Sequence, residues 1–171
     1  MNEEFLEELY EYSLKELSIK LERKRHLETK ALSVLQATAI LISLFLGFDS
    51  KLINSFSGVK LGKLIILKII FYMTVAITLV LLLLALNDKV ANLFGKNRNK
   101  QLKDLPSSEE ILDDYSEDDV KSFQEKMIRN ISDTIKCVDN IIYIKNLLFN
   151  FALNSFIFSV ILLIIIGLSI E

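Results

Sequence analysis

Charged and apolar residues lie in separate blocks along this chain, and three of the blocks contain no charge. The charge-free runs cover residues 31–48, 69–86 and 147–170. The middle run has eighteen residues, and as a helix it is long enough to cross the hydrocarbon core of a bilayer. The pattern therefore predicts an all-α membrane protein with three transmembrane helices, at residues 31–48, 64–86 and 147–170.

The blocks before the first and third runs carry charges but keep a helical pattern of apolar residues. In residues 1–30 the apolar positions recur every three or four residues, at Leu6, Tyr10, Leu14, Leu17 and Leu21. Residues 87–146 contain a heptad-like 3-4-3-4 spacing, also built from branched apolar residues. Such faces avoid water, so we expect the two helices to pack on one another or on neighbouring copies. The residues expected to make these contacts are Leu17, Leu21, Ile128, Ile131, Ile135, Val138 and Ile142.

Residues that interrupt helices are rare, since the chain has five glycines and one proline. We expect the first helix to run into the first span and to end just after Gly47, followed by an external loop at residues 49–63. A loop then occupies the first part of residues 87–146. Ser116 can cap a last helix that reaches Ile170 and breaks near Asn140 or Asn146.

The distribution of lysine and arginine predicts the orientation in the membrane. Residues 1–30 carry six of these cations and residues 87–146 carry ten, out of twenty in the chain. Residues 49–63 carry three. A chain with three spans places the two cation-rich segments on the same side, so we expect both in the cytoplasm. The N-terminus is then inside, the C-terminus is outside, and the membrane is the inner membrane of a cell.

Length and composition exclude several classes of protein. At 171 residues we expect one compact unit. The net charge of −2 gives no reason to expect nucleic acid as a partner. Cys137 is the single cysteine, which excludes a disulfide within the chain.

Residue patterns typical of catalysis or metal binding are missing. His26 is the single histidine, and neither a second histidine nor a second cysteine completes a metal site. The sequence contains no GxSxG, P-loop, GxGxxG or HExxH pattern. We therefore expect no catalytic residues, no metal and no cofactor, and we do not expect an enzyme.

Polar side chains do occur inside the apolar runs. Asn146, Asn150 and Asn154 follow one another at a spacing of four, which places them on one helical face, and Gln36 lies in the first run. Such amides either form hydrogen bonds between helices or line a path for water, and the sequence leaves both interpretations open. The second run has few polar residues, so we expect it to face lipid or to fill space.

The entry to the first span, Glu28-Thr-Lys-Ala, resembles the Asp/Glu-x-Lys-Ala entry of small bacterial anti-phage membrane effectors. These are the transmembrane effectors of cyclic-pyrimidine (Pycsar) signalling and the related SLATT-type effectors. The order of segments is also similar, with Lys136 or Lys145 near the end of the cytoplasmic helix. The resemblance implies a protein that stays silent until a cyclic nucleotide appears, and then forms homo-oligomers that permeabilise the inner membrane.

Two function classes therefore remain as hypotheses. The first is this membrane effector, whose partners are membrane lipid, other copies of the chain, and a cyclic nucleotide or a soluble sensor protein. The second is a non-catalytic scaffold or accessory subunit that docks a soluble cytoplasmic partner. A small transporter is a weaker third, because no ionisable residue lies near the middle of a span to couple an ion.

Overall fold

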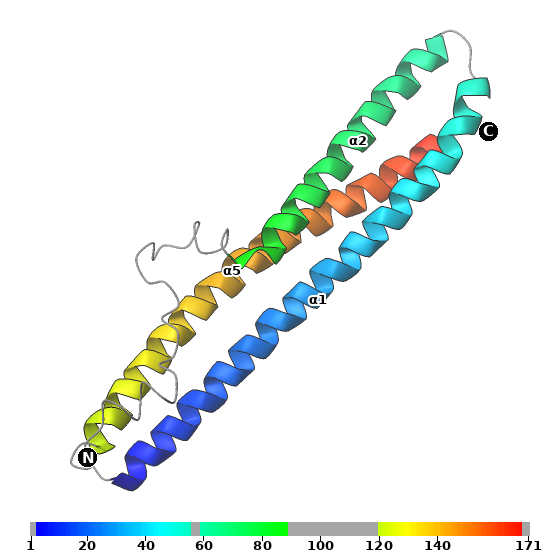
Figure 1. Cartoon of the computed structure of the whole chain (residues 1–171). Helices are drawn as coiled ribbons and strands as arrows, with labels where there is room; N and C mark the ends of the chain where they lie inside the picture. Colours follow the sequence, from blue (N-terminus) through cyan, green and yellow to red (C-terminus); the bar gives the residue numbers. More distant parts are fainter. Residues whose placement is uncertain (1–2, 56–58, 89–119, 169–171) are drawn as a thin grey trace. The chain divides into compact units, whose positions relative to one another are not determined.

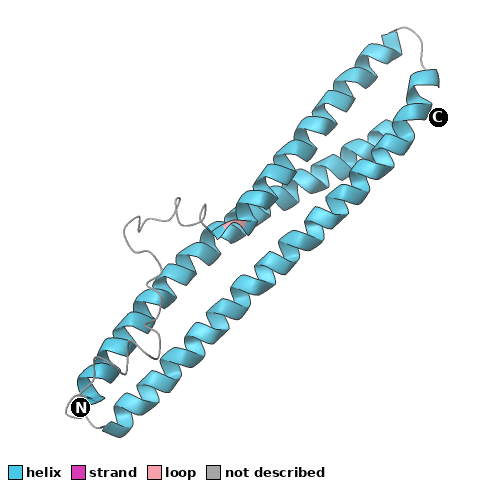
Figure 2. Ribbon diagram, viewed as in Figure 1, coloured by secondary structure: helices cyan, strands magenta, loops and turns pink. Residues whose placement is uncertain are grey.

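The computed structural model describes residues 3–55, 59–88 and 120–168. Three long α-helices account for almost all of them: α1 (Glu3–Ser55), α2 (Val59–Leu86) and α5 (Val120–Leu168) (Figures 1 and 2). Each helix contains a stretch that is long and apolar enough to cross a membrane. The prediction of an all-helical protein with three candidate spans is confirmed. The loop expected at the start of residues 87–146, and the cap at Ser116, lie outside the described residues.

Helix α1 continues beyond the point at which the sequence led us to expect its end. It passes through Gly47 and stops at Ser55, and α2 begins at Val59. The predicted external loop at 49–63 is therefore wrong in extent. A single glycine weakens a helix by only about 1 kcal/mol relative to alanine, and the long helical segment before it outweighs that cost.

Helix α5 is also continuous. It contains no break at Asn140 or Asn146, where the sequence suggested one. Asn146 lies between lysine and leucine, which have high helix propensity, and no proline follows either asparagine. A polar residue alone does not interrupt a helix whose other faces are packed.

The chain divides into two compact units where we expected one. Residues Met1–His26 and Lys89–Ile144 form the first, and Leu27–Asp88 and Lys145–Glu171 form the second. We call them the helix-pair unit and the three-helix unit, after the described helices in each. The division follows the change from charged to apolar sequence along α1 and α5.

The helix-pair unit is held by apolar contacts between α1 and α5. Leu17 packs with three residues of α5, which are Ile131, Ile135 and Val138. Tyr10 and Ile142 lie against this cluster. Five of the seven predicted contact residues therefore meet here, and the two amphipathic segments pack together within the chain.

The other two predicted contacts are not part of the cluster. Leu21 is 39% exposed, and Ile128 is half-buried outside the cluster. The buried side of α1 passes instead through Leu6, Ser13 and Leu17. A serine thus occupies a buried position for which the sequence pattern favoured Leu14, and Leu14 and Leu21 are rotated out of the contact.

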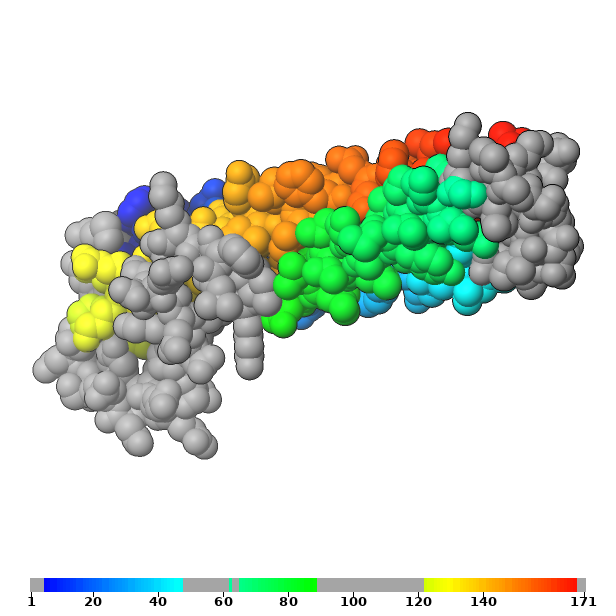
Figure 3. Space-filling model, turned by 90° about the horizontal axis from the view of Figure 1, so that it is seen from above, coloured from blue at the N-terminus to red at the C-terminus, as the bar shows by residue number. Residues whose placement is uncertain are grey.

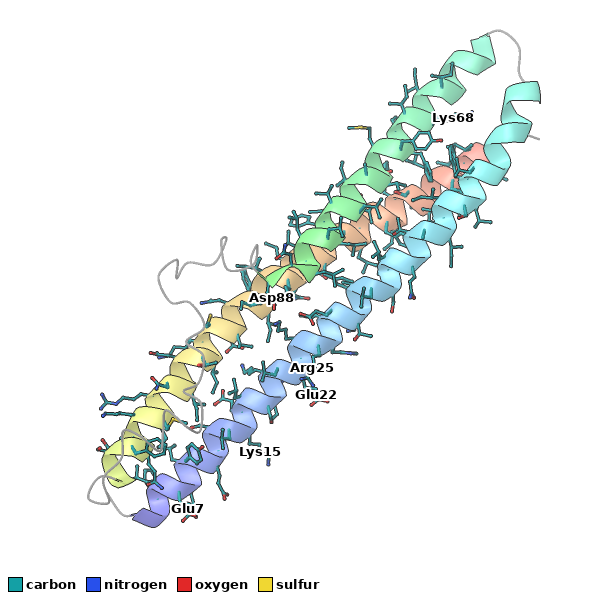
Figure 4. All side chains as sticks on the ribbon, in the orientation of Figure 1. Glu7, Lys15, Glu22, Arg25, Lys68 and Asp88 are labelled. Atoms are coloured by element: carbon teal, nitrogen blue, oxygen red, sulfur yellow. The ribbon has the colours of Figure 1, made fainter. Side chains whose placement is uncertain are left out.

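The outer side of this helix pair is charged. Glu7, Lys15 and Glu22 lie on the side of α1 that faces away from α5 (Figure 4). On the inner side, Lys20 donates hydrogen bonds to both carboxylate oxygens of Asp139, at 2.7 and 2.9 Å. Charged side chains therefore lie on the outside of this unit, and one ion pair joins α1 to α5 beside the apolar cluster.

The three-helix unit has two apolar layers, and each layer takes residues from all three helices. One contains Ala31, Leu82 and Ala152. The second is made by Leu41, Phe45, Phe71, Val75, Leu162 and Ile166. Between the first layer and the second, residue numbers rise in α1 and α5 and fall in α2, so α1 and α5 run parallel and α2 runs antiparallel to them. Figure 3 shows α2 lying against the orange part of α5.

Candidate functional site

Three charged residues flank the apolar runs of the three-helix unit at the same end. Glu28 precedes the first run by three residues, Asp88 follows the second by two, and Lys145 precedes the third by two. Because α2 runs antiparallel to α1 and α5, these positions lie at one level of the unit. Asp88 lies at the end of α2 beside α5 (Figure 4).

The three residues form one cluster of ion pairs, which we call the lysine triad. The Nζ atom of Lys145 donates a hydrogen bond to Oε1 of Glu28 at 2.5 Å. The same Nζ pairs with Oδ1 of Asp88. The Lys145 side chain is 2% exposed, whereas the side chains of Glu28 and Asp88 are 30% and 46% exposed. One buried ammonium group is therefore shared by two carboxylates that reach the surface.

The lysine triad connects all three helices at one point. Glu28 belongs to α1, Asp88 follows α2 and Lys145 belongs to α5. Removal of a buried ammonium group from water costs several kcal/mol, and the attraction of its partners offsets that cost only with good geometry. The triad therefore adds little net stability. Its main effect is on register, because it holds one residue from each helix at the same level.

A second polar contact joins α2 to α5 inside the apolar unit. Ser155 donates a hydrogen bond to the backbone carbonyl of Thr74 at 3.0 Å, and Ser159 donates to Oγ1 of Thr74 at 2.9 Å. Thr78 donates to the same carbonyl at 2.9 Å. Small hydroxyl side chains of this kind satisfy one another where water is absent.

The second apolar run is therefore more than a lipid-facing filler, contrary to our expectation. Phe71 and Thr78 are buried, and the Phe71 ring stacks on that of Phe45 with centroids 4.3 Å apart. The Tyr72 ring meets Phe45 edge-on at 5.2 Å. One face of α2 is thus a principal part of the packing.

The four amides singled out in the sequence lie on the outside of the three-helix unit. Gln36, Asn146, Asn150 and Asn154 are all exposed. They consequently do not lie in the apolar core of their own chain, and both interpretations of them, hydrogen bonds between helices or a path for water, stay predictions. The packing hydrogen bonds come instead from Ser155 and Ser159. We call Asn146, Asn150 and Asn154 the amide face of α5.

The residues considered for catalysis or metal binding are dispersed. His26 is exposed and Cys137 is partly buried. Among the described residues, no three of histidine, cysteine, aspartate and glutamate are placed to hold a metal ion. Lys136, the other lysine noted in the sequence, is exposed and pairs with Asp133 on its own helix at 3.7 Å.

Comparison with protein-family models, with curated proteins and with solved structures found no match to this chain.

Proposed function

We propose that this protein is a membrane effector of bacterial anti-phage defence, which assembles in the inner membrane and makes it permeable when activated. The observation that carries the proposal is the outward amide face of α5. Amides at Asn150 and Asn154 lie within the third apolar run yet are exposed in the single chain. In a bilayer such groups require a polar partner, which is either water or another protein.

A second copy of the chain supplies such a partner directly. Each side-chain amide has both donors and an acceptor, so identical amides can pair with one another. The bilayer holds every copy at one depth, which brings equivalent residues of neighbouring copies to the same level. Assembly through the amide face would gather polar groups in the membrane, and this arrangement favours entry of water and loss of the ion gradient.

The helix-pair unit is the part that we propose to receive the activating signal. Helices α1 and α5 each extend without interruption from this unit into a candidate span. With the N-terminus in the cytoplasm, the unit is accessible to a soluble messenger. The resemblance at Glu28-Thr-Lys-Ala suggests a cyclic nucleotide as that messenger.

A scaffold function is the second candidate, and one observation favours it. Phe5, Tyr12 and Ile19 are spaced seven residues apart on α1, and all three are exposed. Exposed apolar residues in a row are typical of a surface that contacts another protein. A soluble partner on this row would make the chain a membrane anchor for that partner.

Membrane potential in expressing bacteria tests the effector. We expect wild-type protein to dissipate the potential, read with a voltage-sensitive dye, and the double variant Asn150→Leu, Asn154→Leu to lose this effect at least tenfold while still inserting. The control variant Phe151→Leu, Phe158→Leu changes two exposed residues of the same span and should behave like wild type. Equal depolarisation by the asparagine variant would contradict the mechanism. A stable potential in every strain, with a soluble protein that copurifies, would favour the scaffold.

A further inference from the structure

Lys145 occupies a position of α5 that is otherwise small or apolar. Every seventh residue of the helix from Ile131 to Ile166 is buried, and the other members of this series are Val138, Ala152 and Ser159. An apolar side chain would fit the series without the cost of removing an ammonium group from water. Replacement of a buried ion cluster by apolar residues is often neutral or stabilising. Stability therefore does not account for the lysine.

The geometry of the lysine triad allows more than one arrangement. Lys145 is buried and needs at least one carboxylate, because an unpaired buried charge is strongly unfavourable. Glu28 and Asp88 both reach the surface, so either carboxylate can exchange the ammonium group for water while the other remains. Asp88 is the more exposed of the two, at 46% against 30%, so less protein must move to bring its carboxylate fully into water.

We propose that the lysine triad is a switch that controls the docking of α2. In the closed form, which the structure describes, Lys145 holds both carboxylates. In the open form Asp88 is in water, the end of α2 separates from α5, and Glu28 keeps α1 and α5 paired. This inference rests on the proposed function in one respect: the open form is the one that proceeds to breach the membrane.

Thiol labelling measures the opening without reference to activity. Ala85 is buried one turn before Asp88 on α2, and Cys137 is the single natural cysteine. In a Cys137→Ser, Ala85→Cys protein, a water-soluble maleimide should react slowly in membranes. Adding Asp88→Asn removes one partner of the buried ammonium group, and we expect labelling to be at least about tenfold faster.

A matched control exists in the helix-pair unit. Asp139 is also 46% exposed and also pairs with a lysine, Lys20, so Asp139→Asn removes an equivalent ion pair away from α2. Labelling at position 85 should not change in that variant. Faster labelling after Asp88→Asn alone supports the switch. Unchanged labelling after Asp88→Asn, or equal acceleration by both variants, overturns it.

A neutral variant of the triad tests the same inference from the other side. The triple variant Glu28→Gln, Asp88→Asn, Lys145→Met removes all three charges, so nothing remains to exchange with water. When this triple variant also carries the cysteine at position 85, we expect slow labelling. We also expect its thermal unfolding midpoint in detergent to be at or above that of wild type. Fast labelling in the triple variant would contradict the switch. If labelling follows these expectations but no variant affects membrane potential, the switch stands and the proposed function fails.

Discussion

At the scale of single residues, the contact between α2 and α5 depends on a few hydroxyl groups. Thr74 accepts hydrogen bonds from Ser155 at its carbonyl and from Ser159 at its side chain. In an apolar surrounding each such bond between helices is worth about 0.6 kcal/mol on average and up to about 1.7 kcal/mol. These bonds give α2 a fixed rotation against α5, which the apolar contacts alone do not specify.

The variant Ser159→Ala tests this contact. Ser159 is buried and also donates to the carbonyl of Ser155 on its own helix at 3.0 Å. We expect the substitution to lower the free energy of unfolding in mixed micelles by about 0.6–1.7 kcal/mol.

Ser43→Ala is the natural control for that measurement. Ser43 makes the same kind of bond to its own helix, to the carbonyl of Ala39 at 3.0 Å, but is exposed. Its replacement should change the free energy of unfolding by less than about 0.5 kcal/mol. Equal losses in the two variants would mean that the bond from Ser159 to Thr74 contributes nothing.

The sequence alone predicted the amide face of α5 but not the lysine triad. The spacing of Asn146, Asn150 and Asn154 places them on one face of the helix. It does not show whether that face points inward or outward, because the direction depends on which residues of α2 pack against α5. The buried position of Lys145 was predictable from the 3-4-3-4 series of apolar residues that ends at Ile142. Further steps of three and four reach residues 145, 149 and 152. The partners of Lys145, Glu28 and Asp88, are distant in sequence, and no local pattern pairs them.

At the scale of helices, the continuity of α1 and α5 follows from the near absence of proline and glycine. Their parallel direction follows from the order of the three helices, since one antiparallel helix, α2, separates them in the chain. The sequence predicted both helices but misjudged the end of α1 and the rotation of its first part. The buried face of α1 was predicted wrongly because Ser13 lies in the contact with α5, whereas the apolar pattern favours its neighbour Leu14.

The packing of the helix pair is tested by Ile131→Ala. Ile131 is fully buried in the cluster around Leu17, and truncation of such a residue costs about 2–5 kcal/mol. We expect amide hydrogen exchange at residues 127–138 to accelerate accordingly. Leu21→Ala, at an exposed position of the same unit, should change exchange by less than a factor of about two. Strong acceleration by Leu21→Ala would restore the contact face that the sequence suggested.

At the scale of the whole molecule, the candidate spans carry far more apolar surface than the chain itself covers. Between 22% and 28% of the most apolar part of each helix is buried within the chain. The remainder requires lipid or other copies. On this largely apolar exterior, the amide face of α5 sets three exposed amides in a row along one helix, and in the proposed assembly it is where copies meet.

Cysteine cross-linking in membranes tests this central claim most directly. Ile157 and Phe158 are adjacent, equally deep and similarly exposed, at 49% and 47%, but they point about 100° apart around the helix. Ile157 lies seven residues beyond Asn150, on the side of the amide face. Phe158 lies four residues beyond Asn154, at the edge of that face, whereas Ile157 points within about 20° of Asn150 at its centre. In a Cys137→Ser background, oxidation should therefore join copies several times faster through Ile157→Cys than through Phe158→Cys. Adding Asn150→Leu and Asn154→Leu should reduce that product about tenfold. Equal cross-linking at the two positions, or a product that survives loss of the asparagines, would contradict assembly through the amide face.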